Sequence, residues 1–171
     1  MTGMGPAIED LRDRIIDILP RLRRFARSLA RDPHDADDLV QITVERALAH
    51  ADQLHPDSRL ASWLFGILRN AWIDEVRSRH RREPLHAPEA LAEHVGDPAA
   101  GSQAELLCVQ DALARLPEEQ RLAVSLVLIE GLSYKEAAHV MNVPIGTLTS
   151  RLARGRDALQ EMLADTSGTS R

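Results

Sequence analysis

The spacing of apolar residues predicts a helix at the start of the chain. Up to residue 29 they recur at steps of three and four, which is typical of a helix with one buried face. They are Ile8, Leu11, Ile15, Ile18, Leu22, Phe25 and Leu29. Pro20 lies inside this pattern. Because proline removes a helical hydrogen bond, we expect a kink or a break there.

Two further helices are predicted in the first half. The stretch RDPHDADDL supplies capping acids and a proline ahead of a second helix, placed at about 36–50. The apolar positions of this helix are Leu39, Val40, Ile42, Thr43, Ala47 and Leu48. DQLHPDS is typical of a loop, and Ser58 can cap a third helix that extends to about Arg79.

The second half predicts four shorter or amphipathic helices. Residues 105–116 form one that stops before Pro117. PEEQRLAVSLVLIEG predicts the next, with proline and acids in its first turn and glycine at its end. Ser133 and Glu136 match the S-x-x-E capping box, which fixes the start of a short helix. A tight turn at MNVP leads into the last helix.

Residues 83–104 separate these two groups of helices. They contain three prolines and two glycines and only scattered apolar residues, so we expect a flexible linker with at most a short helical turn at 89–95. The sequence therefore predicts an all-α protein of two small helical domains, residues 1–82 and 105–165, joined by this linker. Residues 166–171 are expected to be a disordered tail.

Composition narrows the class of protein. One cysteine, Cys108, cannot form an internal disulfide, which fits a reducing compartment. The N-terminus lacks the pattern of a signal peptide, and no apolar run is long enough to span a membrane. We expect a soluble cytoplasmic protein without membrane insertion of its own.

The net charge of −5 is concentrated in one segment. Residues 1–82 hold 14 arginines against 13 acids, and residues 112–171 hold seven of each sign. Residues 83–111 hold six acids and no Lys or Arg. Because local patches decide contact with a polyanion, the overall sign does not exclude nucleic acid as a partner.

SYKEAAHVMNVPIGTLTSRL has the layout of a helix–turn–helix. Small Ala137 and Ala138 allow close crossing, and a leucine stripe marks the buried side of the second helix at Leu148, Leu152, Leu159 and Leu163. Off that stripe lie Thr147, Ser150, Arg151 and Arg154. Hydroxyls and forked guanidiniums suit a DNA major groove, because arginine binds guanine with two hydrogen bonds. A solvated amphipathic helix is the alternative.

The end of the third helix, RNAWIDEVRSRHRR, is also basic. It has Arg69, Arg77, Arg79, Arg81 and Arg82 against Asp74 and Glu75. Arginines next to aromatic residues can hold a single strand by phosphate contact and base stacking. We expect Trp63 in the core, with Asn70 and Trp72 exposed. A nucleic-acid surface and a solvated helix face both remain open for this cluster.

Three stretches together resemble the extracytoplasmic-function (ECF) group of bacterial RNA polymerase sigma factors. DPHDADDLVQITVERAL is similar to the family's region 2.2, and SWLFGILRNAWIDEVRSRHRR to its regions 2.3–2.4. LARLPEEQRLAVSLVLIEGLSYKEAAHVMNVPIGTLTSRLARGRDAL is similar to region 4. Order and spacing match as well, and the resemblance covers most of residues 8–163.

The resemblance implies a role for each part of the chain. The helix at 36–50 would dock on the β′ clamp helices of core RNA polymerase, through Asp37, Asp38, Leu39 and Gln41. The loop at about 51–61 would capture the opened −10 strand of promoter DNA with Arg69, Asn70, Trp72, Arg77 and Arg79. The helix–turn–helix would read the −35 duplex with Thr147, Thr149, Ser150, Arg151 and Arg154.

The resemblance also implies partners and departures from the family. Contacts to the polymerase β flap and an inhibitory anti-sigma factor are expected, and neither catalysis nor a cofactor belongs to the chain. Thr149 occupies a position that is often basic in relatives. Gly155 stands where the family usually has alanine, and we expect it to weaken the last helix by about 1 kcal/mol.

Two other functions fit parts of the sequence. A free-standing helix–turn–helix regulator would bind DNA without polymerase and would need a dimer to span two half-sites. His34 and Asp35, next to Asp37 and Asp38, superficially resemble a metal-dependent HD phosphohydrolase, but these acids suit a helix N-terminus. His80, His86, His94 and Cys108 lack the spacing of zinc ligands, so we assign no metal.

Overall fold

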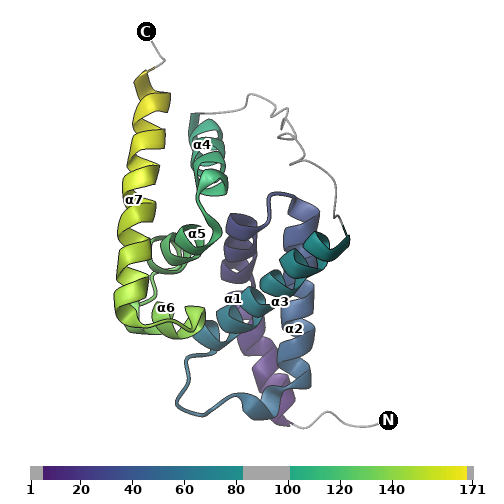
Figure 1. The fold of residues 1–171 in the computed structure, drawn as a ribbon. Coiled ribbons are helices and arrows are strands. Elements are labelled where there is room, and N and C mark those ends of the chain that lie inside the picture. The colour runs from purple at the N-terminus through teal and green to yellow at the C-terminus, as the bar shows by residue number, and fades with distance from the viewer. Residues whose placement is uncertain (1–5, 83–100, 169–171) are drawn as a thin grey trace.

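Three helices form the N-terminal half. The protein is seen in a computed structural model that describes residues 6–82 and 101–168. α1, α2 and α3 pack on one another, with a short 3₁₀ turn, η1, after α2 (Figure 1). Their bounds are Pro6–Leu29 for α1, Pro33–Ala49 for α2, Ala51–Gln53 for η1 and Leu60–Arg82 for α3. Asp32 caps α2, because its carboxylate accepts a hydrogen bond from the His34 N–H at 2.8 Å.

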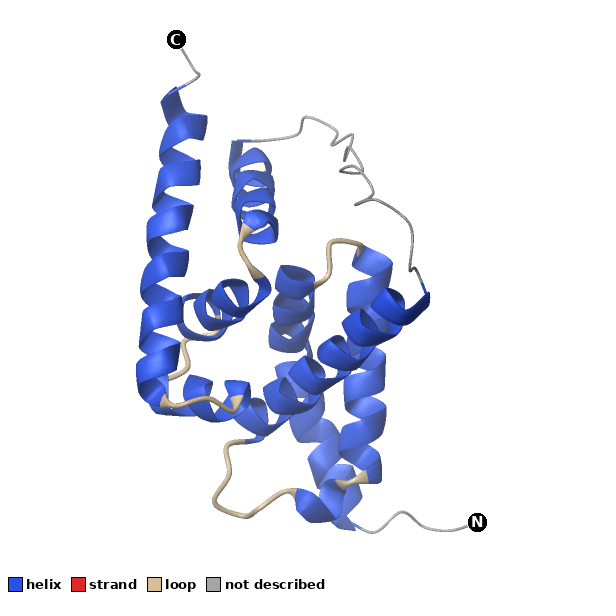
Figure 2. Ribbon diagram, viewed as in Figure 1, coloured by secondary structure: helices blue, strands red, loops and turns tan. Residues whose placement is uncertain are grey.

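The described part of the C-terminal half, residues 101–168, forms four α-helices and a π-helical turn. Long α7 packs along α4, α5 and α6, and the described residues contain no strand (Figure 2). The bounds are Gly101–Arg115 for α4, Glu118–Val124 for α5, Ser125–Ile129 for the π-turn η2, Tyr134–Met141 for α6 and Ile145–Gly168 for α7. The all-α class is therefore confirmed. No described helix has the length and apolar character needed to cross a bilayer.

The two halves pack directly against each other. α1 contacts α4, α5 and η2, while α3 contacts α6. Buried residues of both halves form one continuous apolar cluster. In it Phe25 of α1 meets Phe65 of α3 edge-to-face, with ring centroids 5.1 Å apart. The arrangement is thus a closed one, in which the helix–turn–helix rests on the N-terminal helices.

Several boundaries differ from the sequence predictions. α1 continues through Pro20, so the expected break is absent; Pro20 is exposed and its ring lies toward solvent rather than in the core. α4 starts at Gly101, inside the predicted linker, and α7 extends to Gly168, inside the predicted tail. The rest of the linker, with its suggested turn at 89–95, and residues 169–171 lie outside the described residues.

Gly155 has a packing role that the sequence did not indicate. It is buried on α7 against α5. A Cβ at this position would lie 2.7 Å from Val124 Cγ2 and 3.3 Å from the Gln120 carbonyl oxygen. Carbon atoms in contact normally stay about 3.5–4.0 Å apart. The glycine therefore permits the close approach of α5 and α7, and the expectation that it only weakens α7 is incomplete.

Candidate nucleic-acid interfaces

The helix–turn–helix is formed as predicted. α6 begins at a complete capping box, in which the Glu136 N–H donates to Ser133 Oγ at 3.3 Å and the Ser133 N–H donates to Glu136 Oε2 at 3.0 Å. It ends at Asn142, whose φ of 53° turns the chain toward α7. Ala137 and Ala138 are buried, and α6 packs on both α7 and α3. The capping box and the small residues thus set the angle at which α7 leaves the turn.

The predicted −35 residues lie on the side of α7 away from its buried leucines. Leu148 and Leu152 are buried, whereas Leu159 and Leu163 are only half-buried. Thr149, Ser150 and Arg154 are exposed, and Thr147 and Arg151 are half-buried. Four of these five residues line one surface hollow together with the first residues of α5: Thr147, Ser150, Arg151 and Arg154.

Several polar groups on this surface already have partners within the protein. Thr149 Oγ1 donates to the Ile145 carbonyl at 2.9 Å, and Ser150 Oγ donates to the Gly146 carbonyl at 3.0 Å. Arg151 Nη2 lies 2.6 Å from Glu119 Oε2 at the start of α5. One of the two arginines expected to read DNA is therefore held by a carboxylate of the same half.

The predicted −10 residues on α3 are in more varied surroundings. Asn70 and Arg77 are exposed, and Arg79 is held by Asp35 at 2.6 Å and Glu75 at 3.0 Å. These hydrogen bonds raise the pKa of Arg79. Arg69 is half-buried, and its buried Nε has no hydrogen-bond partner. Burial lowers the pKa of Arg69, against the opposing field of Glu118.

The expected exposure of Trp72 is wrong. Its side chain is only 9 % exposed, and its buried indole N–H has no partner. Trp72 follows Phe65 by two helical turns and Leu68 by one, so it shares their buried side of α3. Trp63, expected in the core, is half-buried and packs against the core. The spacing from Phe65 was the signal that could have placed Trp72.

The predicted polymerase-binding residues divide between surface and core. Asp37, Asp38 and Gln41 are exposed on α2, where Gln41 Nε2 donates to Glu45 Oε1 at 3.0 Å. Leu39 is only 3 % exposed. It belongs to the apolar series through which α2 packs in the N-terminal half, so its side chain is not at the surface in this structure, and its contact with polymerase stays a prediction.

The acids at the start of α2 have structural partners. Asp32 is the N-cap and Asp35 pairs with Arg79. Among the residues that the structure describes, no three His, Cys, Asp or Glu side chains come together in a way that could hold a metal ion. An HD-type metal site therefore has no support from the geometry of this region.

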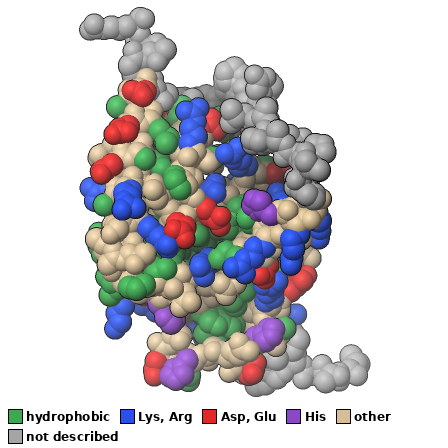
Figure 3. All heavy atoms as spheres, viewed as in Figure 1, with side chains coloured by type: hydrophobic (Ala, Val, Ile, Leu, Met, Phe, Trp, Pro, Cys, Tyr) green, Lys and Arg blue, Asp and Glu red, His purple; other side chains and the backbone are tan. Residues whose placement is uncertain are grey.

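The two predicted DNA surfaces both lie near the junction of the halves. Arg69 of α3 lies close enough to Glu118, Arg151 and Glu119 for their charges to act on it. Arg59, in the predicted −10 loop, pairs with Glu136 of the helix–turn–helix at 3.1 Å. On the face shown in Figure 3, basic side chains gather around a smaller group of acidic ones. The carboxylates thus occupy positions between two sets of cationic side chains.

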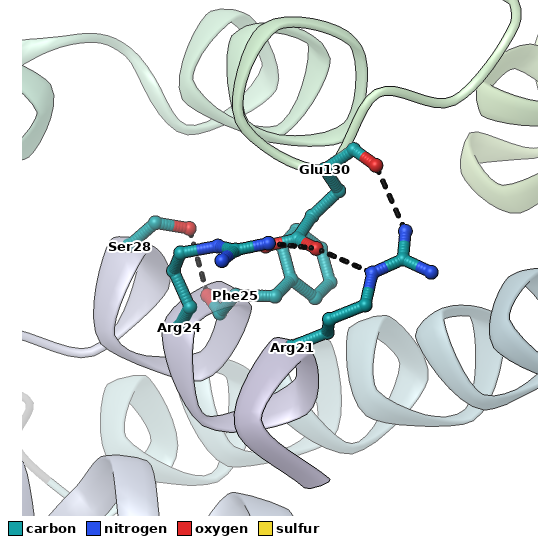
Figure 4. A network of polar contacts seen from close by, with 5 residues as sticks. All are labelled: Arg21, Arg24, Phe25, Ser28 and Glu130. Carbon is teal, nitrogen blue, oxygen red and sulfur yellow. Dashed lines mark hydrogen bonds and ion pairs between the residues drawn. The ribbon is translucent and has the colours of Figure 1, made fainter. Parts of the chain in front are cut away.

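Sequence reasoning missed one polar network in this junction. Arg21 and Arg24 of α1 both bind Glu130, which directly follows η2 (Figure 4). The partners are 109 and 106 residues apart in the chain. No spacing rule connects residues so distant, so this network could be found only in three dimensions.

These features define a class of protein. A helix–turn–helix, joined to a second helical domain with arginines on its last helix, is typical of a DNA-binding protein with two contact surfaces. Residues 15–82 match the family model for sigma-70 region 2, and residues 106–159 match the model for sigma-70 region 4. Both models match in the order predicted, which a free-standing regulator does not explain.

Similarity to individual proteins establishes the family. The ECF RNA polymerase sigma factor EcfG of Rhodopseudomonas palustris is 41 % identical over 159 residues, which cover 92 % of this chain and 87 % of that protein. The chain belongs to the ECF RNA polymerase sigma factors, the transcription factors that direct RNA polymerase to start at promoters.

Two solved structures share the fold. One is the sigma factor RpoE of Bartonella quintana in complex with the anti-sigma factor NepR; it has a TM-score of 0.80 and 35 % identity, over 95 % of this chain and 99 % of that one. The other is CnrH in complex with the cytosolic domain of CnrY, with a TM-score of 0.68 and 27 % identity, over 96 % of this chain and 92 % of that one.

Proposed function

We propose that this sigma factor divides promoter recognition between its two helical domains. The domain of residues 1–82 binds core RNA polymerase and the opened −10 strand, and the domain of residues 105–165 reads the −35 duplex. The observation that supports this division most directly is the exposed side of α7, where Thr147, Ser150, Arg151 and Arg154 share one hollow. Hydroxyls and guanidiniums on a helix–turn–helix match base edges and phosphates.

On α3 we assign the −10 strand to the exposed Asn70 and Arg77, together with Arg69 and Arg79. Arg69 suits this role because its buried Nε lacks a partner that a phosphate could supply. Trp72 supports the helix from inside rather than by stacking on a base in this arrangement.

We assign the contact with the polymerase clamp to Asp37, Asp38 and Gln41, which are exposed together on α2. An acidic patch of this kind binds a basic partner surface and is sensitive to salt. In this proposal the chain performs no catalysis, needs no cofactor and works in the cytoplasm beside the polymerase, whose active site makes the RNA.

An anti-sigma factor is the expected regulatory partner. The solved relative RpoE was crystallised with its anti-sigma factor NepR, and this chain is similar to RpoE along nearly its whole length. We infer that a protein of the same kind binds this chain and keeps it from polymerase.

Run-off transcription on fragments of genomic DNA tests the assignment, with core RNA polymerase from Rhodopseudomonas palustris, the source of the 41 % identical relative. Arg151→Ala should reduce promoter-specific transcripts at least tenfold, the loss expected for about 1.4 kcal/mol of base contact, while core binding stays unchanged. The double variant Asp37→Asn, Asp38→Asn should weaken core binding and leave the affinity for duplex −35 DNA unchanged. If Arg151→Ala reduces core binding instead, the assignment of the two surfaces is wrong.

A further inference from the structure

The junction between the halves is centred on a buried carboxylate. Glu130 has a side-chain exposure of 0 %. Arg24 donates to it from Nε at 2.8 Å and from Nη2 at 2.9 Å, and Arg21 Nε donates at 3.2 Å. Arg21 Nη2 also donates to the Glu130 backbone carbonyl at 2.8 Å. In Figure 4 both guanidiniums reach from α1 to this one residue of the C-terminal half.

The backbone around Glu130 is built to present it. The helix widens into the π-turn η2, where the Glu130 N–H donates to the Ser125 carbonyl at 2.9 Å. Gly131 follows with a φ of +70°, a conformation that glycine adopts without strain. Arg21 also lies over the Phe65 ring, with its guanidinium carbon 5.3 Å from the ring centroid. Glu130 therefore connects η2 to α1 and, through Arg21, to α3.

The hydrogen bonds of this network form only when the halves are closed. Among the residues that the structure describes, the side chains that donate to the Glu130 carboxylate come from α1, more than 100 residues away in the chain. Removing the arginines would leave the buried Glu130 carboxylate without a counter-charge in the closed state, and this destabilises that state although Arg21 and Arg24 are themselves 37 % and 53 % exposed. The exposed pair of Arg59 and Glu136 is different, because Arg59 is 80 % exposed and such pairs contribute little.

The closed arrangement does not fit a promoter. By their names, the −10 and −35 elements lie about 25 base pairs apart, which is about 85 Å at 3.4 Å per pair. A compact chain of 171 residues has a radius of gyration of only about 15 Å. In this structure Arg69 and Arg151, the predicted readers of the two elements, are close enough for their charges to interact. The halves must separate before both elements are bound at once.

We propose that Glu130, Arg21 and Arg24 form an autoinhibitory clamp that holds the free sigma factor closed and unable to bind a promoter. This inference rests on the proposed function of the two domains. Opening the clamp lets the α3 and α7 surfaces move apart to the spacing of the two promoter elements, and binding of polymerase and DNA then favours the open state against the clamp. Variants that break the clamp should shift the population toward that state.

A distance measurement tests the clamp without reference to transcription. Donor and acceptor dyes are attached to Gln53→Cys and Gln160→Cys, two exposed positions on opposite halves, in a Cys108→Ser background. With the clamp residues unsubstituted, most molecules should show high energy transfer between the two dyes. Glu130→Gln should lower the ratio of closed to open molecules at least tenfold, and the double variant Arg21→Gln, Arg24→Gln should do the same from the other side.

The matched control is Arg59→Ala, which breaks an exposed contact across the same junction and should leave the transfer distribution unchanged. Circular dichroism checks that each variant keeps its helix content; if Glu130→Gln unfolds, the arginine double variant still decides the question. A clamp variant that remains closed, or an intact clamp that is already open, would overturn the proposal.

Run-off transcription at limiting sigma factor separates this inference from the proposed function. Glu130→Gln should lower the concentration of sigma factor needed for half-maximal transcription. The decrease should follow the larger fraction of its molecules that are open and able to bind. If the dyes report opening but the half-maximal concentration is unchanged, the clamp is not inhibitory. If no variant directs transcription while the dyes still report opening by the clamp variants, the proposed function fails and the clamp stands as a structural contact.

Discussion

Replacing Gly155 with alanine separates helix propensity from packing. In an exposed helix the change would stabilise the protein by about 1 kcal/mol. Here the new methyl would lie 2.7 Å from Val124 Cγ2, and Val124 is only 2 % exposed, so it has little room to move. Forcing an extra methyl group into a packed core costs about 1–3 kcal/mol. The net expectation is a loss of about 0–2 kcal/mol.

Thermal and urea unfolding followed by far-UV circular dichroism measure this loss. For a chain of this length, 1 kcal/mol corresponds to about 2–4 °C in Tm, so Gly155→Ala should lower Tm by up to about 8 °C. Gly146→Ala is the matched control, because nothing lies within 4 Å of a Cβ added there. It should leave Tm unchanged or raise it.

A double-mutant cycle identifies the atom responsible. Val124→Ala removes the methyl that the new Cβ would meet, so Gly155→Ala should cost less in that background than in the original one. If Gly155→Ala raises Tm as Gly146→Ala does, or if its cost is the same in both backgrounds, the close approach of α5 and α7 does not explain the glycine.

Three further predictions concern the helix–turn–helix. Ser133→Ala should lower the free energy of unfolding at pH 7 by about 1 kcal/mol in urea titrations, because it removes the cap of α6. Hydrogen bonds from the Ser133 side chain and backbone lower the pKa of Glu136 below its ordinary value of 4.5. The stabilisation by Glu136 is therefore fully present above pH 4.5 and is lost as pH falls through the lowered pKa. The original chain and Glu136→Ala should then converge in their free energy of unfolding at acid pH, and a constant difference down to acid pH would contradict this. Glu119→Gln frees Arg151 from its 2.6 Å partner and should raise the affinity of the sigma factor, bound to core RNA polymerase, for promoter DNA by up to about fivefold in fluorescence anisotropy, the equivalent of a surface ion pair of about 1 kcal/mol. Unchanged binding would show that the pair does not compete with DNA.

Local patterns were sufficient for the helices of this protein. The S-x-x-E box placed the start of α6, because a cap involves residues only three positions apart. Leucine spacing identified the buried side of α7 at Leu148 and Leu152. These features depend on neighbours in sequence, so the sequence alone predicts them.

Three features of single residues were predicted less well. Trp72 was expected on the surface because arginines flank it, yet its position relative to Phe65 places it inside. Pro20 was expected to interrupt α1, but the helix continues with Pro20 exposed. Gly155 was interpreted from helix propensity alone, whereas the close approach of Val124 on α5 explains why a residue without a side chain is needed there. The causes differ: for Trp72 the flanking arginines were given more weight than the spacing from Phe65, and only for Gly155 was a local rule used where contact between helices decides.

The polar groups at the junction differ in how well their hydrogen bonds are satisfied. In the proposed clamp, this difference is what allows the closed state to open. Glu130 is buried and receives several hydrogen bonds from two partly exposed arginines, whereas Arg69 keeps a buried Nε without a partner. Arg151 is held by Glu119, which is 64 % exposed, so its pair is weak. Phosphates can therefore offer Arg69 and Arg151 better partners than the closed protein does, while nothing on DNA can replace the arginines around Glu130. Opening then requires that contacts with DNA and polymerase exceed two losses, the arginine contacts of Glu130 and the apolar packing between the halves, and substitution of Glu130 changes only the first of these losses.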